Sequence, residues 1–187
     1  MRSPVYPLSV SEYLEAEAKS EFRHEYVGGE VFAMAGASRK HNLIAGNIYS
    51  RLRSHLRGSG CDAFMSDMKV KLKSEIKKKS IFYYPDVVVS CELQTQDQFV
   101  LNSPSLIVEV LSPSTEVIDK REKLQNYQTI LSLQEYVLVD QDRIHIEIYR
   151  RIDEENWTRE TLGREDKLQL DSVNLTLPVM DIYEDVF

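Results

Sequence analysis

The segment that most constrains the fold is 105–111, which is almost continuously apolar. A short run that is apolar at consecutive positions is typical of a central strand buried on both faces of a sheet. Such a strand needs a covering layer on each side. The sequence predicts an amphipathic helix over 39–56 before it and, after a strand exit and helix cap at 112–115, a second helix to about Ile130. The chain therefore reads as a mixed sheet flanked by helices.

Other elements extend this pattern. Ser9 and Glu12 match a capping box at the start of a short helix. The pair Gly28-Gly29 is typical of a hairpin turn between two short strands. Further strands are predicted at 68–73, 81–89, 136–140, 144–148 and 157–162, and a polar loop at 92–103. Pro85 is expected to make its strand an edge strand or to kink it.

From residue 39 onward the predicted order is helix, strand, strand, strand, helix, strand. We expect one α/β domain with a mixed sheet over 1–187. It would comprise an N-terminal helix and hairpin (1–37), a core (38–142) and C-terminal strands (143–187), so that hairpins flank the core at both ends.

Composition fits an ordinary globular protein, with 42% hydrophobic and 28% charged residues. The apolar runs are too short for a membrane-spanning helix, and the N-terminus lacks the apolar core of a secretory signal. Two cysteines, Cys61 and Cys91, fit neither a metal-binding pattern nor a disulfide framework. We expect reduced thiols in a cytoplasmic protein.

Charge is unevenly distributed along the chain. The formal net charge of −7 argues against a general nucleic-acid binder. Between residues 39 and 79, however, eleven basic residues stand against three acidic ones. Lys69, Lys71 and Lys73 alternate with apolar residues, so they would share one face of a strand and could contact phosphates. On charge alone, a solvated helix followed by a charged hairpin is the simpler explanation.

Two carboxylates interrupt apolar strands. Asp86 follows Pro85 and precedes three valines, and Glu109 lies within the buried run. A buried carboxylate is costly unless it is paired, protonated or metal-bound. Two of them converging at one edge of a sheet would make an oxygen-ligand site for Mg²⁺ or Mn²⁺. Spacing alone favours the ordinary alternative, in which Asp86 caps a turn and Glu109 pairs with a nearby lysine or arginine.

Several segments resemble the Uma2 family of restriction endonuclease-like proteins. Two of them match family signatures, Tyr-Pro-Asp-Val-Val-Val at 84–89 and Leu-Ile-Val-Glu-Val-Leu-Ser-Pro-Ser-Thr at 106–115. The likeness continues through 24–30, 38–41, 119–127 and 136–140. It covers nearly the whole chain in the right order. The family belongs to the PD-(D/E)XK nuclease superfamily, so the resemblance implies a restriction-endonuclease-like core, which agrees with the predicted element order.

The resemblance also implies roles for particular residues. In this superfamily an Asp and a second acid hold the metal ion, and a lysine positions or activates the water. Carried over, Asp86 and Glu109 become the metal ligands. The lysine expected two residues after Glu109 is replaced by Leu111, and the family pattern points instead to Lys123 on the following helix.

Helical spacing places Lys120 and Tyr127 on the same face as Lys123, so the three side chains could line the site together. We count Lys120 among the candidate nucleic-acid contacts. The ordinary alternative for Lys123 is an ion pair with Asp119, four residues earlier.

Glu25 on the hairpin and His41 near the start of the first core helix match recurrent family positions. The resemblance implies an additional acid at Glu25 and a polar group lining the site at His41. Alternatively, Glu25 forms a cross-strand charge pair and His41 is a solvated first-turn residue.

The predicted function is that of a metal-dependent endonuclease that cleaves nucleic acid, with DNA as the expected substrate. A two-fold homodimer would suit the two strands of a duplex. Two alternatives remain open. One is a binding or regulatory module with this fold, which the lost lysine at 111 favours. The other is a metal-dependent phosphohydrolase of small nucleotides, which the negative net charge favours.

Overall fold

The structure is a computed structural model and describes residues 7–34, 36–73, 79–92, 97–113 and 115–187. Two sheets and a two-stranded ribbon make up its β structure. Its helices are α1 (Val10–Glu17), α2 (Arg39–His55), α3 (Glu116–Ile118), α4 (Leu124–Gln128) and α5 (Val179–Ile182), with a π-helical turn at Asp119–Lys123 and a 3-10 turn at Asp171–Val173. None of the helices within the described ranges is long and apolar enough to cross a membrane.

The larger sheet has six strands in the order β11-β10-β9-β8-β6-β3. They are β3 (Asp62–Met65), β6 (Val87–Ser90), β8 (Pro104–Leu111), β9 (Glu135–Asp140), β10 (Ile146–Arg151) and β11 (Trp157–Leu162). Strands β8 and β9 are parallel, and the other neighbours are antiparallel. The prediction that 105–111 is a buried central strand is confirmed.

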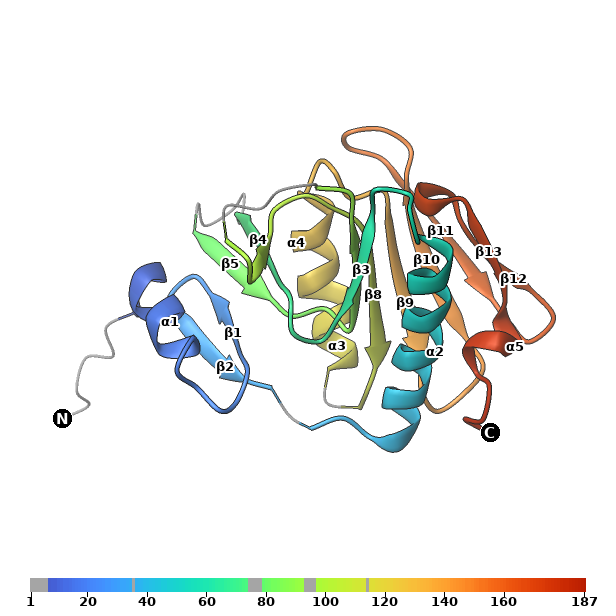
Figure 1. Cartoon of the computed structure of the whole chain (residues 1–187), viewed down its shortest axis with the longest axis horizontal. Coiled ribbons are helices and arrows are strands. Elements are labelled where there is room, and N and C mark those ends of the chain that lie inside the picture. Colours follow the sequence, from blue (N-terminus) through green and yellow to red (C-terminus); the bar gives the residue numbers. More distant parts are fainter. Residues whose placement is uncertain (1–6, 35, 74–78, 93–96, 114) are drawn as a thin grey trace.

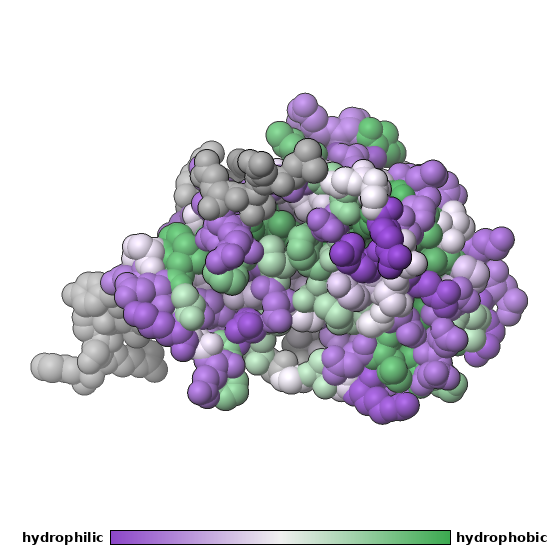
Figure 2. Space-filling model, in the orientation of Figure 1, coloured by the Kyte–Doolittle hydropathy of each residue, from purple (hydrophilic) through white to green (hydrophobic). Residues whose placement is uncertain are grey.

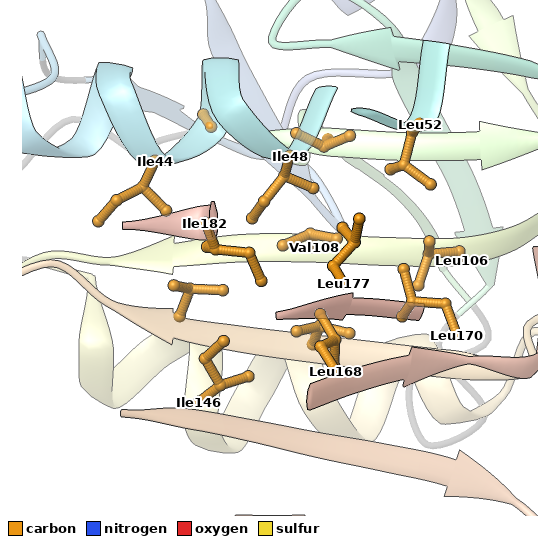
Figure 3. Close-up of a cluster of buried hydrophobic side chains, with 14 of the residues drawn as sticks. Ile44, Ile48, Leu52, Leu106, Val108, Ile146, Leu168, Leu170, Leu177 and Ile182 are labelled. Atoms are coloured by element: carbon orange, nitrogen blue, oxygen red, sulfur yellow. The ribbon is translucent and has the colours of Figure 1, made fainter. Parts of the chain in front are cut away.

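Both faces of this sheet are covered. Helix α2 crosses one face together with α5 and the ribbon of β12 (Lys167–Leu170) and β13 (Leu175–Pro178) (Figure 1). Ile44 and Ile48 of α2 are buried there in one cluster with Leu106 and Val108 of β8 (Figure 3). Each such side chain contributes roughly 1.5–3 kcal/mol when fully buried. The opposite face carries Glu109, because it alternates with Val108 along the strand.

That opposite face packs against α4 and a second sheet, with strand order β2-β1-β5-β4-β7. Its strands are β1 (His24–Val27), β2 (Glu30–Ala33), β4 (Lys69–Lys73), β5 (Ser80–Tyr83) and β7 (Val100–Leu101). Figure 1 shows α1, β1 and β2 as a lobe at the side of the larger sheet. The capping box of Ser9 and Glu12 and the Gly28-Gly29 turn are both confirmed.

Three predictions about the strands are wrong in detail. The expected strand 81–89 is two strands, because the chain leaves β5 at Tyr84-Pro85 and enters β6 in the other sheet. Strand 68–73 belongs to the second sheet as β4, and the first core strand is β3, which the sequence did not reveal. The supposed polar loop contains the buried β7. Within the larger sheet and its helices the order helix, strand, strand, strand, helix, strand is found, as α2, β3, β6, β8, α3–α4 and β9, although its first strand is not the predicted one.

The expectation of reduced cysteines is also wrong. Cys61 and Cys91 form a disulfide. Strands β3 and β6 pair with Asp62 opposite Ser90, so the residues just outside this pair lie opposite each other as well. The bond therefore joins the ends of the edge strand and its neighbour. With the thiols paired, cysteine usage gives no support to a cytoplasmic location.

Candidate active site

Glu109 is the centre of a buried polar cluster on β8. Only 3% of its surface is exposed. Lys123 and Tyr127 both donate hydrogen bonds to its Oε1 atom, each at 3.1 Å. The backbone N–H of Asp86 approaches Oε2 at 3.4 Å. One oxygen is therefore held by two strong donors, while the other faces Asp86 with a single weak contact.

The Lys123 ammonium lies among three carboxylates. Its Nζ is 2.9 Å from Glu25 Oε1, 3.1 Å from Glu109 Oε1 and 3.4 Å from Asp119 Oδ1. Lys123 therefore forms the i,i+4 pair with Asp119 and also contacts Glu109, beside which the family resemblance places it. Asp119 and Lys123 bound a π-helical turn, a distortion that is frequent at functional sites.

Asp86 is held by the strand on one side and by α2 on the other. Its Oδ2 accepts a 2.7 Å hydrogen bond from the backbone N–H of Val110. The same oxygen lies 3.1 Å from His41 Nε2. His41 reaches it from the first turn of α2, where Ser38 caps the helix by accepting from the His41 backbone N–H. His41 is thus a partner of Asp86, not a solvated residue.

Glu25 joins the second sheet to this cluster. It projects from β1, and its Oε1 accepts from the backbone N–H of Tyr84 at 3.3 Å in addition to contacting Lys123. The cross-strand pair considered for Glu25 is absent among the described residues, since Phe32 lies opposite it on β2. The structure therefore brings together all five predicted catalytic residues: Glu25, His41, Asp86, Glu109 and Lys123.

Negative charge is in excess in this cluster. Burial raises the pKa of the Glu109 carboxyl well above its usual value, and the Lys123 charge offsets only part of this effect. Burial likewise raises the pKa of Asp119, again against the effect of Lys123. For Lys123 itself burial would lower the pKa, but the surrounding carboxylates raise it well above the usual value, so its ammonium stays charged. Burial opposes a charged His41, yet Asp86 outweighs it and the pKa of His41 is raised.

The donor set fits a divalent cation held by few protein ligands. Among the described residues no three His, Cys, Asp or Glu side chains form a ready-made metal cage. Mg²⁺ usually binds through one or two carboxylates plus waters and substrate phosphates, which matches Asp86 and Glu109. A further sign is Asp119, whose buried Oδ1 atom makes no hydrogen bond and has the Lys123 ammonium only at 3.4 Å. The excess of carboxylates over cations would be relieved by a bound cation.

The four lysines expected to contact nucleic acid lie elsewhere. Lys71 is opposite Phe82, on the face of the second sheet that packs towards α1, and Lys69 and Lys73 share that face by alternation. Glu25 points to the other face, because it alternates with Tyr26 of the α1-facing cluster. Lys69 is also only 8% exposed, with its ammonium 3.2 Å from the Tyr84 hydroxyl. Lys120 pairs with Glu116 and Glu147 instead of joining Lys123.

Comparison with known proteins identifies the family of the chain. Residues 10–180 match the Uma2 family, described as "Putative restriction endonuclease". The chain belongs to the Uma2 family. Two uncharacterized Synechocystis sp. proteins resemble it: slr1290, 34% identical over 97% of this chain and 94% of its own length, and sll1609, 35% identical over 80% and 84%.

A crystal structure of an Anabaena variabilis protein, described as "a putative nuclease belonging to DUF820", shares the Uma2 chain's fold. The TM-score is 0.73, with 19% sequence identity, and the match covers 97% of this chain and 100% of the other. At this identity the likeness shows the fold alone. It supports the mixed α/β architecture predicted from the sequence.

Two features of the site were underestimated from the sequence. Asp119 was considered only as an ordinary helical partner of Lys123, although it is 2% exposed and part of the cluster. Tyr127 is predicted from its helical spacing only to line the site, and it proves to be a direct donor to Glu109. The signal for both was their i,i+4 spacing around Lys123, which does not by itself distinguish a surface pair from a buried one.

Proposed function

We propose that this Uma2 protein is a metal-dependent endonuclease that hydrolyses phosphodiester bonds of nucleic acid, with DNA as the expected substrate. The observation that carries the proposal is the meeting of Asp86, Glu109 and Lys123 at the end of β8, inside a fold shared with the Uma2 family. A bound Mg²⁺ or Mn²⁺ would supply Lewis-acid polarisation of a phosphate oxygen and a more acidic water.

The chain's own residues would divide the work. Asp86 and Glu109 Oε2 would hold the cation, and His41 fixes the orientation of Asp86 through its Nε2 contact. Lys123 and Tyr127 fix Glu109 through Oε1 and leave Oε2 for the cation. Lys123 also supplies a charge that burial among carboxylates keeps positive, and such fixed charges stabilise negative charge that develops on a phosphate.

A cleavage assay tests the proposal directly. Supercoiled DNA, single-stranded DNA, RNA and short oligonucleotides are incubated with Mg²⁺, with Mn²⁺ or with EDTA. We expect metal-dependent cleavage by the wild type and its loss in Asp86→Asn and Glu109→Gln. Glu147→Gln, which alters another buried glutamate on a strand outside the cluster, should retain activity when its fold is verified.

Three outcomes would contradict the proposal. Cleavage that persists unchanged in both site variants would indicate a contaminating nuclease. Metal binding without cleavage of any nucleic acid would favour the binding module. Cleavage confined to mononucleotides would favour a small-nucleotide phosphohydrolase. The homodimer stays a prediction, and light scattering with and without DNA is the measurement that checks it.

A further inference from the structure

Strand β2 forms the outer edge of the second sheet and is exposed along its whole length. It nevertheless carries two large apolar side chains, Val31 at 40% and Phe32 at 50% exposure. Exposed edge strands are usually short and protected by charged or proline residues, so apolar side chains on one call for an explanation. Figure 2 shows apolar residues in green among polar ones in purple on the lobe that contains this strand.

The strand register places Phe32 next to the candidate active site. Phe32 lies directly opposite Glu25 in the antiparallel pair of β1 and β2. Directly opposed residues share a face, and their Cβ atoms are about 4.5–5.5 Å apart. Glu25 contacts Lys123 within the cluster. The Phe32 ring is therefore the outward neighbour of a cluster carboxylate, whereas Val31 lies opposite Tyr26 and faces the other side of the sheet.

Apolar side chains are also exposed beside the cluster. Val117 and Ile118, which directly precede Asp119, are 65% and 44% exposed. The strand lysines face α1 instead, on the sheet face opposite to Glu25. A duplex presents phosphates on its outside and keeps its bases stacked inside, so an apolar ring gains little from it. An unpaired nucleotide presents the flat face of its base.

We propose that Phe32 stacks on an unpaired base of the substrate, so that the enzyme acts on single-stranded DNA or RNA, or on an unpaired nucleotide within a duplex. This inference rests on the proposed nuclease function and narrows its substrate class. Aromatic rings bind bases of any sequence because every base has a π-face, so the stacking contributes selectivity for unpaired structure and not for sequence.

Binding measured without cleavage tests the inference. Fluorescence anisotropy in EDTA gives the Kd for three labelled probes: an oligothymidylate of about 12 nucleotides, the same backbone without bases, and a blunt duplex. We expect Phe32→Ala to weaken oligothymidylate binding by about 5- to 150-fold, the range for loss of one base stack. Phe32→Trp should retain binding, and Phe32→Leu, which keeps an apolar side chain without a ring, should lose it.

The abasic probe and the opposite sheet face supply the controls. Phe32→Ala should leave the affinities for the abasic probe and for the duplex unchanged, because neither offers a base to stack. Val31→Ala, on the same strand but the other face, should bind all three probes as the wild type does. Equal weakening towards the abasic probe would overturn the inference, since the contact would then be with the backbone.

Two further outcomes separate this inference from the proposed function. If Phe32→Ala changes only the oligomeric state seen by light scattering, with unchanged Kd for all probes, then β2 is a subunit contact and base stacking is wrong. If the wild type cleaves nothing but binds oligothymidylate in a Phe32-dependent manner, the nuclease proposal fails while stacking stands. Wild-type cleavage that prefers duplex over single strands, unchanged in Phe32→Ala, would overturn the stacking proposal alone.

Discussion

The protein contains two ion clusters, each around a buried glutamate, with opposite charge balance. In the candidate active site one ammonium, Lys123, lies among three carboxylates. On β10 one carboxylate, Glu147, lies beside two cations, Lys120 at 3.1 Å and Arg159 at 2.8 Å, with the His145 ring at 3.7 Å. Each cluster also has one tyrosine that donates to its glutamate, Tyr127 or Tyr149.

The pKa values of the two glutamates are shifted in opposite directions. Burial tends to raise the pKa of both. At Glu147 the contacts with Lys120 and Arg159 outweigh burial, and its pKa is lowered. At Glu109 the single charge of Lys123 does not suffice, and its pKa stays well above the usual value. A cluster whose charges balance stabilises the fold, whereas one with unmatched carboxylates is strained and suited to recruit a cation, as expected of a functional site.

Removal of the lysine should give the largest difference between the clusters. Lys123→Met leaves Glu25, Glu109 and Asp119 buried without a cation, so we expect the free energy of unfolding to fall by about 3–5 kcal/mol at pH 8 and cleavage to be lost. Lys120→Met leaves Glu147 with Arg159 and should cost about 1 kcal/mol or less. Urea unfolding at pH 8 measures both. Equal losses in the two variants would contradict the difference in charge balance.

Neutralising the glutamates should give effects of opposite sign. In Glu109→Gln the amide oxygen can still accept hydrogen bonds from Lys123 and Tyr127, while one excess negative charge is removed. We therefore expect the free energy of unfolding to rise by about 1 kcal/mol, although cleavage is abolished. In Glu147→Gln the neighbouring cations lose their shared carboxylate, so the free energy of unfolding should fall by about 1–2 kcal/mol. Urea denaturation, paired with the cleavage assay, checks the signs. A destabilised Glu109→Gln protein would mean that the carboxylate contributes more to the fold than to function.

Removing the hydroxyl of the tyrosine in each cluster, Tyr127 or Tyr149, should also affect the two clusters differently, but by less. Tyr127→Phe keeps the ring, whose centroid lies 5.2 Å from that of Tyr136, and removes only the hydroxyl that fixes Glu109 Oε1. Groups that orient a metal ligand typically change metal affinity 10- to 100-fold, and we expect about 10-fold weaker Mn²⁺ binding by titration calorimetry. Tyr149→Phe removes the corresponding donor to Glu147 and should leave Mn²⁺ affinity unchanged. An unchanged Kd in Tyr127→Phe would show that Lys123 alone orients Glu109.

Part of the candidate active site could be predicted from the sequence. Glu109 could be predicted as buried because it interrupts a continuous apolar run, and this needs only local pattern. Alternation could predict that Lys69, Lys71 and Lys73 share a face, but not that the opposite face meets the active site, because strand periodicity carries no information on which layer covers which face. Asp119 was underestimated for the same reason, since spacing does not reveal burial.

Contacts between distant strands were the least accessible from sequence. The disulfide between Cys61 and Cys91 depends on the register of β3 against β6, and β3 is a four-residue strand without a clear pattern. Likewise, Pro85 indicated a break in its strand, but the assignment of the two halves to different sheets follows only from the assembled topology. Glu25, which contacts Lys123, was singled out through the family resemblance and not through a physical signal in the hairpin.

The smallest expected difference between the two glutamates is in how each changes the free energy of unfolding with pH. The folded-state pKa of Glu109 is raised above its usual 4.5. Its contribution to the free energy of unfolding is therefore fully present below pH 4.5 and is lost as pH rises through the raised pKa. The pKa of Glu147 is lowered from 4.5, so its contribution is present above pH 4.5 and is lost as pH falls. As pH rises above 4.5, Glu109→Gln should gain stability relative to the wild type until the raised pKa of Glu109 is passed. The loss of stability in Glu147→Gln relative to the wild type should stay constant above pH 4.5 and become smaller only in acid. Urea unfolding at pH steps measures both trends, and a flat difference for Glu109→Gln would mean that Lys123 already balances the cluster.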